Sequence, residues 1–183
     1  MDTALSSAPD VFLGGTCGGN PWRERFCTTL SRRGTSFFDP QVDDWQPWMS
    51  DMENACLRSS PLVLFPVLSS TLGLGSLAEV GFSILSIMRS IQAGQQRALV
   101  VLIDPTADPS MRITVRHPDG RKTLEHPGPA LLAESDRTRA LVRSKVAQET
   151  WRDGIWLVDD LEAMHETMLR LLDDDSLPIR QKA

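Results

Sequence analysis

Residues Ala98–Ile103 read Ala-Leu-Val-Val-Leu-Ile, a run of six apolar residues without polar alternation. A strand that is buried on both faces has this pattern, and such strands occur in parallel sheets covered by helices. Two similar short runs, Leu62–Phe65 and Ile155–Val158, precede and follow it along the chain. The three runs therefore predict the centre of a parallel α/β sheet.

Two further strands are predicted nearer the start of the chain, at Val11–Leu13 and Ser36–Phe38. Helical patterns fill the intervals, and we expect helices over Pro21–Gly34, Pro47–Arg58, Leu77–Gln92, Leu131–Thr150 and Leu161–Leu172. Alternation around Pro118-Asp119-Gly120 predicts a β-hairpin insertion over Arg112–Leu124, within about residues 110–126. The repeated strand–helix order predicts a flavodoxin-like (Rossmann-like) three-layer sandwich, with a five-stranded parallel sheet in the order 2-1-3-4-5.

The length of 183 residues suits a single domain over residues 1–183, with a frayed tail from about residue 173. Acidic residues outnumber basic ones by 24 to 19, and the formal net charge of −5 argues against nucleic-acid binding. The basic series from Arg137 to Lys145, offset by nearby acids, is expected to form a solvated helix face.

The sequence also indicates the cellular compartment of the protein and whether it needs a metal or cofactor. The first residues lack a signal-peptide pattern, and the apolar run Leu72–Met88 carries Glu79, which makes it a poor membrane span. An odd number of cysteines (Cys17, Cys27 and Cys56) is typical of a reducing compartment, so we expect a cytoplasmic protein. Cys17 and Cys27 lack zinc-site spacing, and no metal or cofactor is expected.

The predicted strand order locates the ligand site. In open α/β sheets, ligands bind beyond the carboxyl ends of the strands at which the order reverses, here strands one and three. This rule selects two loops rich in Gly, Ser and Thr, Gly14–Trp22 and Pro66–Ser76.

The first loop supplies six candidate substrate-binding residues. Its four glycines let a ligand approach the backbone, and N–H groups at the following helix start can hold hydroxyls or an anion. It matches neither the Walker A pattern nor the dinucleotide fingerprint, and a merely flexible turn with a solvated arginine is the alternative. The candidates are Gly14, Gly15, Thr16, Asn20, Trp22 and Arg23.

The second loop supplies the candidate catalytic residue, Glu79, together with Gly75 and Ser76. Ser76 and Glu79 have the spacing of a capping box, which is a purely structural alternative. In the first turn of a helix, the dipole holds a carboxylate ionised by about 0.3–1 kcal/mol. An ionised carboxylate facing a crevice is a competent nucleophile toward an anomeric carbon.

A third cluster of candidates follows the second strand. Carboxylates here can accept hydrogen bonds from sugar hydroxyls or base amino groups, and a tryptophan can stack on a base. An acidic turn before the helix at Pro47 is the alternative. The candidates are Asp39, Asp43, Asp44, Trp45 and, in the following helix, Glu53.

Three segments together resemble the nucleoside 2-deoxyribosyltransferase-like family, namely Phe12–Cys17 with Trp22-Arg23, Phe38–Trp45 and Ser76–Val80. The resemblance implies a flavodoxin-like fold and a retaining reaction at an N-glycosidic bond. In that reaction Glu79 attacks C1′ of a 2′-deoxynucleoside and forms a glycosyl ester, which a second base or water then attacks.

The resemblance also implies roles for other residues. Gly15, Thr16 and Asn20 would lie near the sugar or base, and Asp43, Asp44 and Glu53 are candidates for base protonation and sugar recognition. The implied partners are a nucleoside or nucleotide and a free nucleobase, in a protein that forms homo-oligomers. Two features of better-studied members have no counterpart: a tyrosine near the first strand, and an aspartate in the segment that here reads Ser69–Gly73.

Two other functions stay open. The pattern Gly73-x-Gly75-Ser76-x-x-Glu79 also resembles the Gly-rich segment of nucleotide phosphoribohydrolases, which would make the reaction a hydrolysis. Such an enzyme needs phosphate ligands, for which the first loop and Arg23 are the evident source. A non-catalytic nucleotide-binding or sensor module is the third possibility, because a fold does not fix its function.

Overall fold

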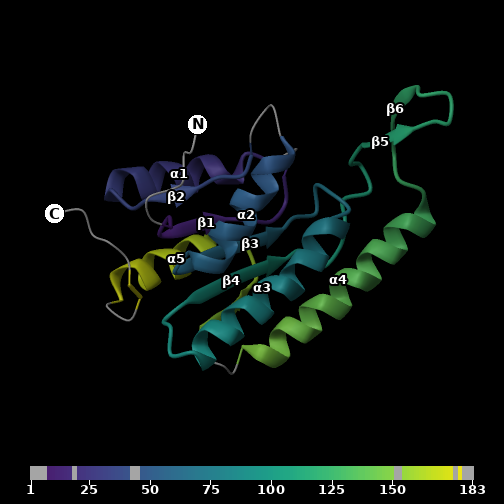
Figure 1. Cartoon of the computed structure of the whole chain (residues 1–183). Coiled ribbons are helices and arrows are strands. Elements are labelled where there is room, and N and C mark those ends of the chain that lie inside the picture. The colour runs from purple at the N-terminus through teal and green to yellow at the C-terminus, as the bar shows by residue number, and fades with distance from the viewer. Residues whose placement is uncertain (1–7, 18–19, 42–45, 151–153, 175–176, 179–183) are drawn as a thin grey trace.

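The computed structural model describes residues 8–17, 20–41, 46–150, 154–174 and 177–178. Its elements follow one another as shown in Figure 1: β1 (Val11–Leu13), α1 (Trp22–Arg33), β2 (Phe37–Phe38), α2 (Pro47–Ser59), β3 (Leu62–Val67), α3 (Leu74–Gln92), β4 (Ala98–Ile103), β5 (Ile113–Arg116), β6 (Lys122–Glu125), α4 (Pro129–Glu149), β7 (Ile155–Val158) and α5 (Leu161–Asp173).

The main sheet has the strand order β2-β1-β3-β4-β7, and every neighbouring pair is parallel. This is the order 2-1-3-4-5 predicted from the sequence, so the flavodoxin-like fold is confirmed. The chain passes from β1 outward to β2 and then back to β3 on the other side of β1. The order therefore reverses between β1 and β3, and the loops that follow these two strands meet at one edge of the sheet.

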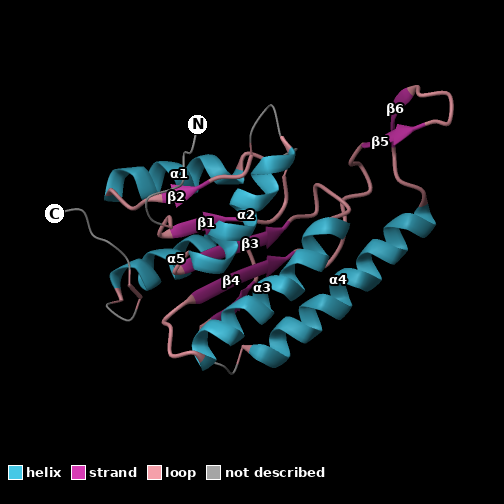
Figure 2. Cartoon of the chain, viewed as in Figure 1, coloured by secondary structure: helices cyan, strands magenta, loops and turns pink. Residues whose placement is uncertain are grey.

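Helices cover both faces of the sheet, and β4 shows why its sequence lacks alternation. Val100 and Leu102 join a core cluster with α1 and α5, whereas Leu99, Val101 and Ile103 join a second cluster with α2, α3 and α4. All six residues of β4 are buried. In Figure 2, α3 and α4 run side by side along one face.

β3 is longer than predicted because Pro66 does not end it. β1 stops at Leu13, opposite Leu64, whereas β3 continues to Val67. No residue of β1 therefore pairs with Pro66, whose nitrogen has no hydrogen to donate to a neighbouring strand. On its other side Pro66 lies in register with Leu102 of β4. The end of β3 thus overhangs β1 at the edge where the strand order reverses.

α3 begins at Leu74, three residues before the predicted start at Leu77. By length and composition this helix is apolar enough to cross a membrane. In the structure it lies along the sheet and buries Leu77, Val80 and Ile87 in the core.

The segment after β4 forms the expected hairpin, in which β5 and β6 pair antiparallel. Figure 1 shows the hairpin standing outside the layers, beyond the N-terminal end of α4. The expectation of a solvated basic face on α4 is wrong at Arg139, whose side chain is fully buried.

The C-terminal segment stays attached to the core for longer than predicted. α5 continues to Asp173, and Leu177 is buried in the cluster that contains α1 and α5. The remainder of the predicted frayed tail, residues 175–176 and 179–183, lies outside the described residues.

Candidate functional site

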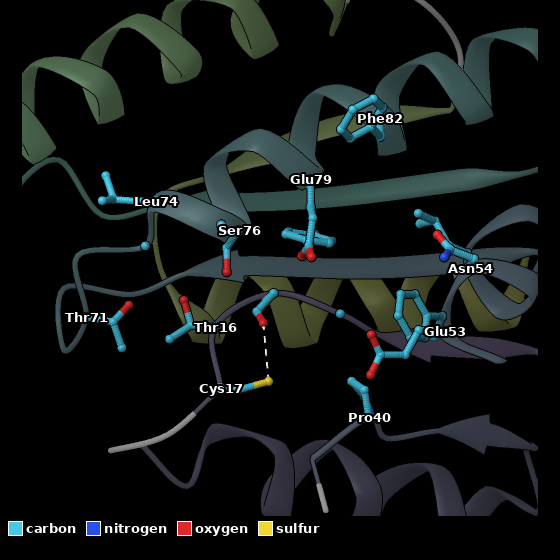
Figure 3. Close-up of a pocket in the computed structure, with 17 residues that line it drawn as sticks. Thr16, Cys17, Pro40, Glu53, Asn54, Thr71, Leu74, Ser76, Glu79 and Phe82 are labelled. Carbon is cyan, nitrogen blue, oxygen red and sulfur yellow. Dashed lines mark hydrogen bonds between the residues drawn. The ribbon is translucent and has the colours of Figure 1, made fainter. Parts of the chain in front are cut away.

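A cavity of about 410 Å³ opens beside the carboxyl ends of β1 and β3, where the strand-order rule predicts a ligand site. Figure 3 shows Glu79 of α3 and Glu53 of α2 both pointing into it. The cavity is lined by Phe12, Gly14, Gly15, Thr16, Cys17, Pro40, Glu53, Asn54, Leu57, Phe65, Thr71, Gly73, Leu74, Gly75, Ser76, Glu79 and Phe82.

Thr16 ties the two loops of the cavity together. Its backbone N–H donates to the carbonyl oxygen of Pro66 at 2.8 Å. Its hydroxyl oxygen accepts the backbone N–H of Leu68 at 3.0 Å. The β1–α1 loop therefore crosses the overhanging end of β3 in a fixed register.

Gly15 makes this crossing possible. Its φ of +82° is a left-handed conformation that L side chains rarely adopt, and a Cβ at this position would lie 2.3 Å from the carbonyl oxygen of Pro66. Only a residue without a side chain allows the loop to approach β3 this closely. Gly15 thus has a structural cause in the crossing itself.

Arg23 holds the β1–α1 loop from behind and does not line the cavity. Its guanidinium is 3% exposed and donates to the carbonyl oxygens of Leu13, Gly14 and Thr16 at 3.3, 3.0 and 2.7 Å. Its Nε also lies 3.1 Å from a carboxylate oxygen of Asp39. These partners occupy the charge that the sequence hypothesis reserved for a substrate anion, so Arg23 supports the loop and does not contact the cavity.

Trp22 and Asp39 also help to hold the β1–α1 loop. The indole N–H of Trp22 donates to the carbonyl oxygen of Thr16 at 3.2 Å, and the ring is 4% exposed within the core. Asp39 neutralises Arg23 and accepts the backbone N–H of Gln41 at 2.9 Å. None of Trp22, Arg23 and Asp39 is among the residues that line the cavity, and their direct contact with a substrate stays a prediction.

Glu79 projects from the second turn of α3, because Gly73 and not Ser76 precedes the helix. Gly73 is the N-cap at φ +67°, and no side chain caps this helix end. The predicted capping box between Ser76 and Glu79 is therefore wrong, and Glu79 is not needed as a cap. Partial desolvation in the cavity raises the pKa of Glu79. The expectation that Glu79 lies in the first turn, where the helix dipole acts most strongly, is wrong because the helix begins at Leu74.

Glu53 supplies a second carboxylate from α2. Its negative charge is the second cause of the raised pKa of Glu79, and both carboxylates line the same cavity. The neighbouring turn of α2 is fixed to the core through Cys56, which is 1% exposed. Glu53, a candidate for substrate contact in the sequence, thus lies in the lining of the cavity.

The structure divides the candidate site residues into three groups. Seven line the cavity: Gly14, Gly15, Thr16, Glu53, Gly75, Ser76 and Glu79. Four lie among the described residues but not in the lining: Asn20, Trp22, Arg23 and Asp39. Asp43, Asp44 and Trp45 lie outside the described residues.

Several lining residues were not singled out from the sequence. Thr71, Gly73 and Leu74 lie in the loop that the strand-order rule selected, so the rule contained that signal. Phe12 and Phe65 are buried strand residues, which look like ordinary core in sequence. Asn54 follows Glu53 directly in α2, and only the packing of α2 beside α3 brings it to the cavity.

A family model described as nucleoside 2-deoxyribosyltransferase like matches residues 8–105. That segment is more than half of the chain. The chain belongs to this family. A search of curated proteins gives no match.

The segment shared with the nucleoside 2-deoxyribosyltransferase-like family runs from just before β1 to just after β4. It contains every residue that lines the cavity, from Phe12 to Phe82. The hairpin, α4, β7 and α5 lie beyond it. The family resemblance noted in the sequence is thus confirmed over the part of the fold that builds the cavity.

Replacing Gly15 by alanine tests the loop crossing. The added Cβ would meet the Pro66 carbonyl in a left-handed backbone conformation, so we expect Gly15→Ala to lower the free energy of unfolding by at least about 1–3 kcal/mol. Urea denaturation measures this change.

The matched control is Gly75→Ala, at a second glycine of the same cavity. A Cβ at Gly75 meets nothing within 4 Å, and the residue lies in the first turn of α3. Alanine there should leave stability unchanged or raise it by about 0.5–1 kcal/mol. Equal stability of the Gly15 variant and the wild type would contradict the crossing.

Proposed function

We propose that this protein cleaves the N-glycosidic bond of 2′-deoxynucleosides and transfers the sugar to another base, with Glu79 as nucleophile and Glu53 as the acid that protonates the leaving base. The observation that carries the proposal is the pair of carboxylates, one from α3 and one from α2, that line one cavity. Retaining glycosidases use such a pair of carboxyl groups.

The proposed reaction has two displacements at C1′. A carboxylate oxygen of Glu79 attacks C1′, and the bond from C1′ to the base nitrogen breaks with its electron pair going to the base. The base takes a proton from Glu53 and leaves. A nitrogen of the second base then attacks C1′ and gives its proton to the Glu53 carboxylate, and the ester bond to Glu79 breaks. Two inversions give net retention.

The two proposed roles require different protonation states of the two carboxyl groups. A charged Glu79 with a protonated Glu53 is the productive state, because the nucleophile needs its lone pair and the leaving base needs the proton. Glu79 and Glu53 supply both the nucleophile and the acid, so the proposed reaction uses no cofactor.

The lining favours a nucleoside over a nucleotide. Among the described residues that line the cavity there is no Lys, Arg or His, whereas two carboxylates are present. Arg23, the one cation considered for a phosphate, donates to backbone carbonyls and pairs with Asp39. A 5′-phosphate would therefore meet repulsion, which argues against the phosphoribohydrolase alternative. Phe12 and Phe65 add an apolar wall that suits a planar base.

We also propose that the protein is a homo-oligomer that uses the exposed side of α3. Leu74, Phe82 and Leu85 are 49%, 67% and 50% exposed on this helix, and Leu74 and Phe82 also line the cavity. A second copy of the chain over this side would bury these apolar side chains and cover the cavity mouth.

Glu79→Gln tests the nucleophile. The amide keeps the shape of the side chain but forms no glycosyl ester, so we expect base exchange between a 2′-deoxynucleoside and a second free base to fall at least about a thousandfold. Chromatography of the products measures exchange, and the assay is repeated with the 5′-monophosphate, which should react more slowly than the nucleoside.

Glu166→Gln, on α5 at the opposite face of the sheet, is the control and should retain full activity. Unchanged exchange in the Glu79 variant would overturn the nucleophile assignment. Release of free sugar without exchange would make the protein a hydrolase, and nucleoside binding without turnover in the wild type would make it a sensor.

The activity of the protein should depend on the protonation of Glu79. Since the pKa of Glu79 is raised above its ordinary value of 4.5 by desolvation and by Glu53, activity should be lost on acidification at a higher pH than for an ordinary glutamate. Glu53→Gln removes the like charge and should move this loss to lower pH. A deoxynucleoside of an N7-methylated purine is the substrate, because its base leaves without protonation.

The same variant separates the acid role of Glu53 from its electrostatic role. With an ordinary deoxynucleoside, Glu53→Gln should lower kcat/KM by about 10²–10⁴-fold, whereas with the N7-methylated purine substrate it should lose little. Equal losses on both substrates would contradict a role in base protonation. An unmoved acid limb would contradict the coupling between the two carboxylates.

The oligomer proposal has its own test. Phe82→Glu introduces a charge into the apolar side of α3 and should shift the mass measured by light scattering toward that of a monomer. Leu124→Glu, on the hairpin strand β6 and 62% exposed, is the matched control and should leave the mass unchanged. A monomeric wild type would overturn the proposal, and dissociation by the Leu124 variant alone would move the interface to the hairpin.

A further inference from the structure

A buried guanidinium lies against the β3–α3 loop on the side of α4. Arg139 is 0% exposed, although it lies in a helix rich in charged residues. Each of its five N–H hydrogens has one acceptor, and four of the five acceptors are backbone carbonyl oxygens. The acceptors are Val67 O and Asp104 O at 3.1 Å each, Leu68 O at 2.9 Å, Thr71 O at 2.6 Å and Ser135 Oγ at 3.3 Å.

Such an arrangement is costly unless every donor is paired. A buried cation loses its hydration, and desolvation lowers the pKa of Arg139 accordingly. The carbonyl dipoles of the loop offset this loss only while they converge on the guanidinium. The loop and Arg139 therefore fix each other: the loop solvates the cation, and the cation determines the direction in which the loop carbonyls point.

Two neighbours reinforce this geometry. The hydroxyl of Ser135, one turn before Arg139 in α4, donates to the carbonyl oxygen of Leu72 at 3.0 Å. Gly73 lies directly on the guanidinium, since a Cβ there would be 3.1 Å from Arg139 Nη2 and 2.7 Å from Val67 Cγ1. Gly73 is also the N-cap of α3, so the contact with Arg139 determines where the helix that carries Glu79 begins.

We propose that Arg139 is a positioning residue for the cavity, which holds the β3–α3 loop so that Thr71, Gly73 and the first turns of α3 form its wall. This role rests on the proposed function, because it concerns the same cavity and the same nucleophile. It also crosses the boundary of the family segment, which ends at residue 105. A residue of the C-terminal part of the chain thus sets the geometry of a site built from the N-terminal part.

Arg97 provides a matched control for burial and charge. It is 5% exposed, and its guanidinium donates to the carbonyl oxygens of Ser60 and Leu57 at 2.9 and 2.6 Å. It precedes β4, at the amino ends of the strands and hence at the opposite edge of the sheet from the β3–α3 loop. Its other acceptors are the hydroxyls of Ser86 and Ser90 in α3, and Leu57, which lines the cavity, contributes only its backbone carbonyl. Its replacement therefore removes a comparable buried network without touching the β3–α3 loop.

The experiment compares Arg139→Lys with Arg97→Lys. Lysine keeps the charge but has three donors in place of five, so both variants should have a lower Tm. Below both melting temperatures, Arg139→Lys should lower kcat/KM for base exchange by about tenfold to a hundredfold, whereas Arg97→Lys should stay within about threefold of wild type. Equal losses at equal destabilisation, or an unaffected Arg139 variant, would overturn the proposal.

Hydrogen exchange tests the positioning separately from the chemistry. Backbone amides of residues 68–77 should exchange faster in Arg139→Lys and in Gly73→Ala, which displaces the loop from an intact guanidinium. They should be unchanged in Arg97→Lys. If the wild type has no glycosidic activity, the proposed function fails, and faster exchange confined to the Arg139 and Gly73 variants still supports the positioning.

Chemical rescue completes the test. In Arg139→Ala, added guanidinium ion should enter the vacated space, restore slow exchange of residues 68–77 and recover part of kcat/KM. The same ion should give Arg97→Ala no increase in kcat/KM. If the amides of residues 68–77 still exchange slowly in the Arg139 variants without added guanidinium, the loop keeps its conformation without Arg139, and the proposal is wrong.

Discussion

Two hydrogen bonds of Thr16 close the edge of the sheet at which the strand order reverses. The N–H of Thr16 donates to Pro66, and its hydroxyl accepts from Leu68, so the loop after β1 crosses the end of β3. The crossing is possible because β3 extends beyond β1 and because Gly15 adopts a left-handed conformation. The lining residues of the two loops and of α3 are placed relative to this crossing, since both loops continue from it into helices. The rest of the lining includes Glu53 and Asn54, which come from α2.

Loops of this kind leave many backbone carbonyls without strand or helix partners. A buried carbonyl without a hydrogen bond is costly. In this chain two arginine side chains donate hydrogen bonds to the buried carbonyls of the two loops. Arg23 donates to carbonyls of the β1–α1 loop, and Arg139 donates to carbonyls of the β3–α3 loop. Arg23 pairs with Asp39, whereas Arg139 donates its hydrogen bonds to carbonyl and hydroxyl oxygens and has the charges of Asp104 and Asp136 nearby. With the cations turned toward the backbone, the described lining of the cavity keeps a negative character from Glu53 and Glu79.

The sequence contained most of the fold, because each strand of the main sheet is a short apolar run and the helices α1, α2, α3 and α5 each have a repeating apolar face. The boundaries that it missed have identifiable causes. β3 continues through Pro66 because its neighbour β1 has already ended, and α3 begins at Leu74, directly after Gly73, which lies against Arg139. Both causes involve residues far apart in the chain. A local pattern contains no information on where a neighbouring strand stops or on which arginine lies beneath a loop.

For the site, the sequence by itself determined the two loops, the glycines that let them approach each other, and Glu79 as the carboxylate that follows them. The strand order, which the apolar runs imply, was enough for that. Only the tertiary structure decided that Glu53 faces Glu79, that Trp22 and Arg23 support the loop from its far side, and that Arg139 is buried. The physical reason is that the spacing of residues along the sequence determines which face of a helix each side chain occupies. The groups that this face contacts come from other elements, and local spacing does not identify them.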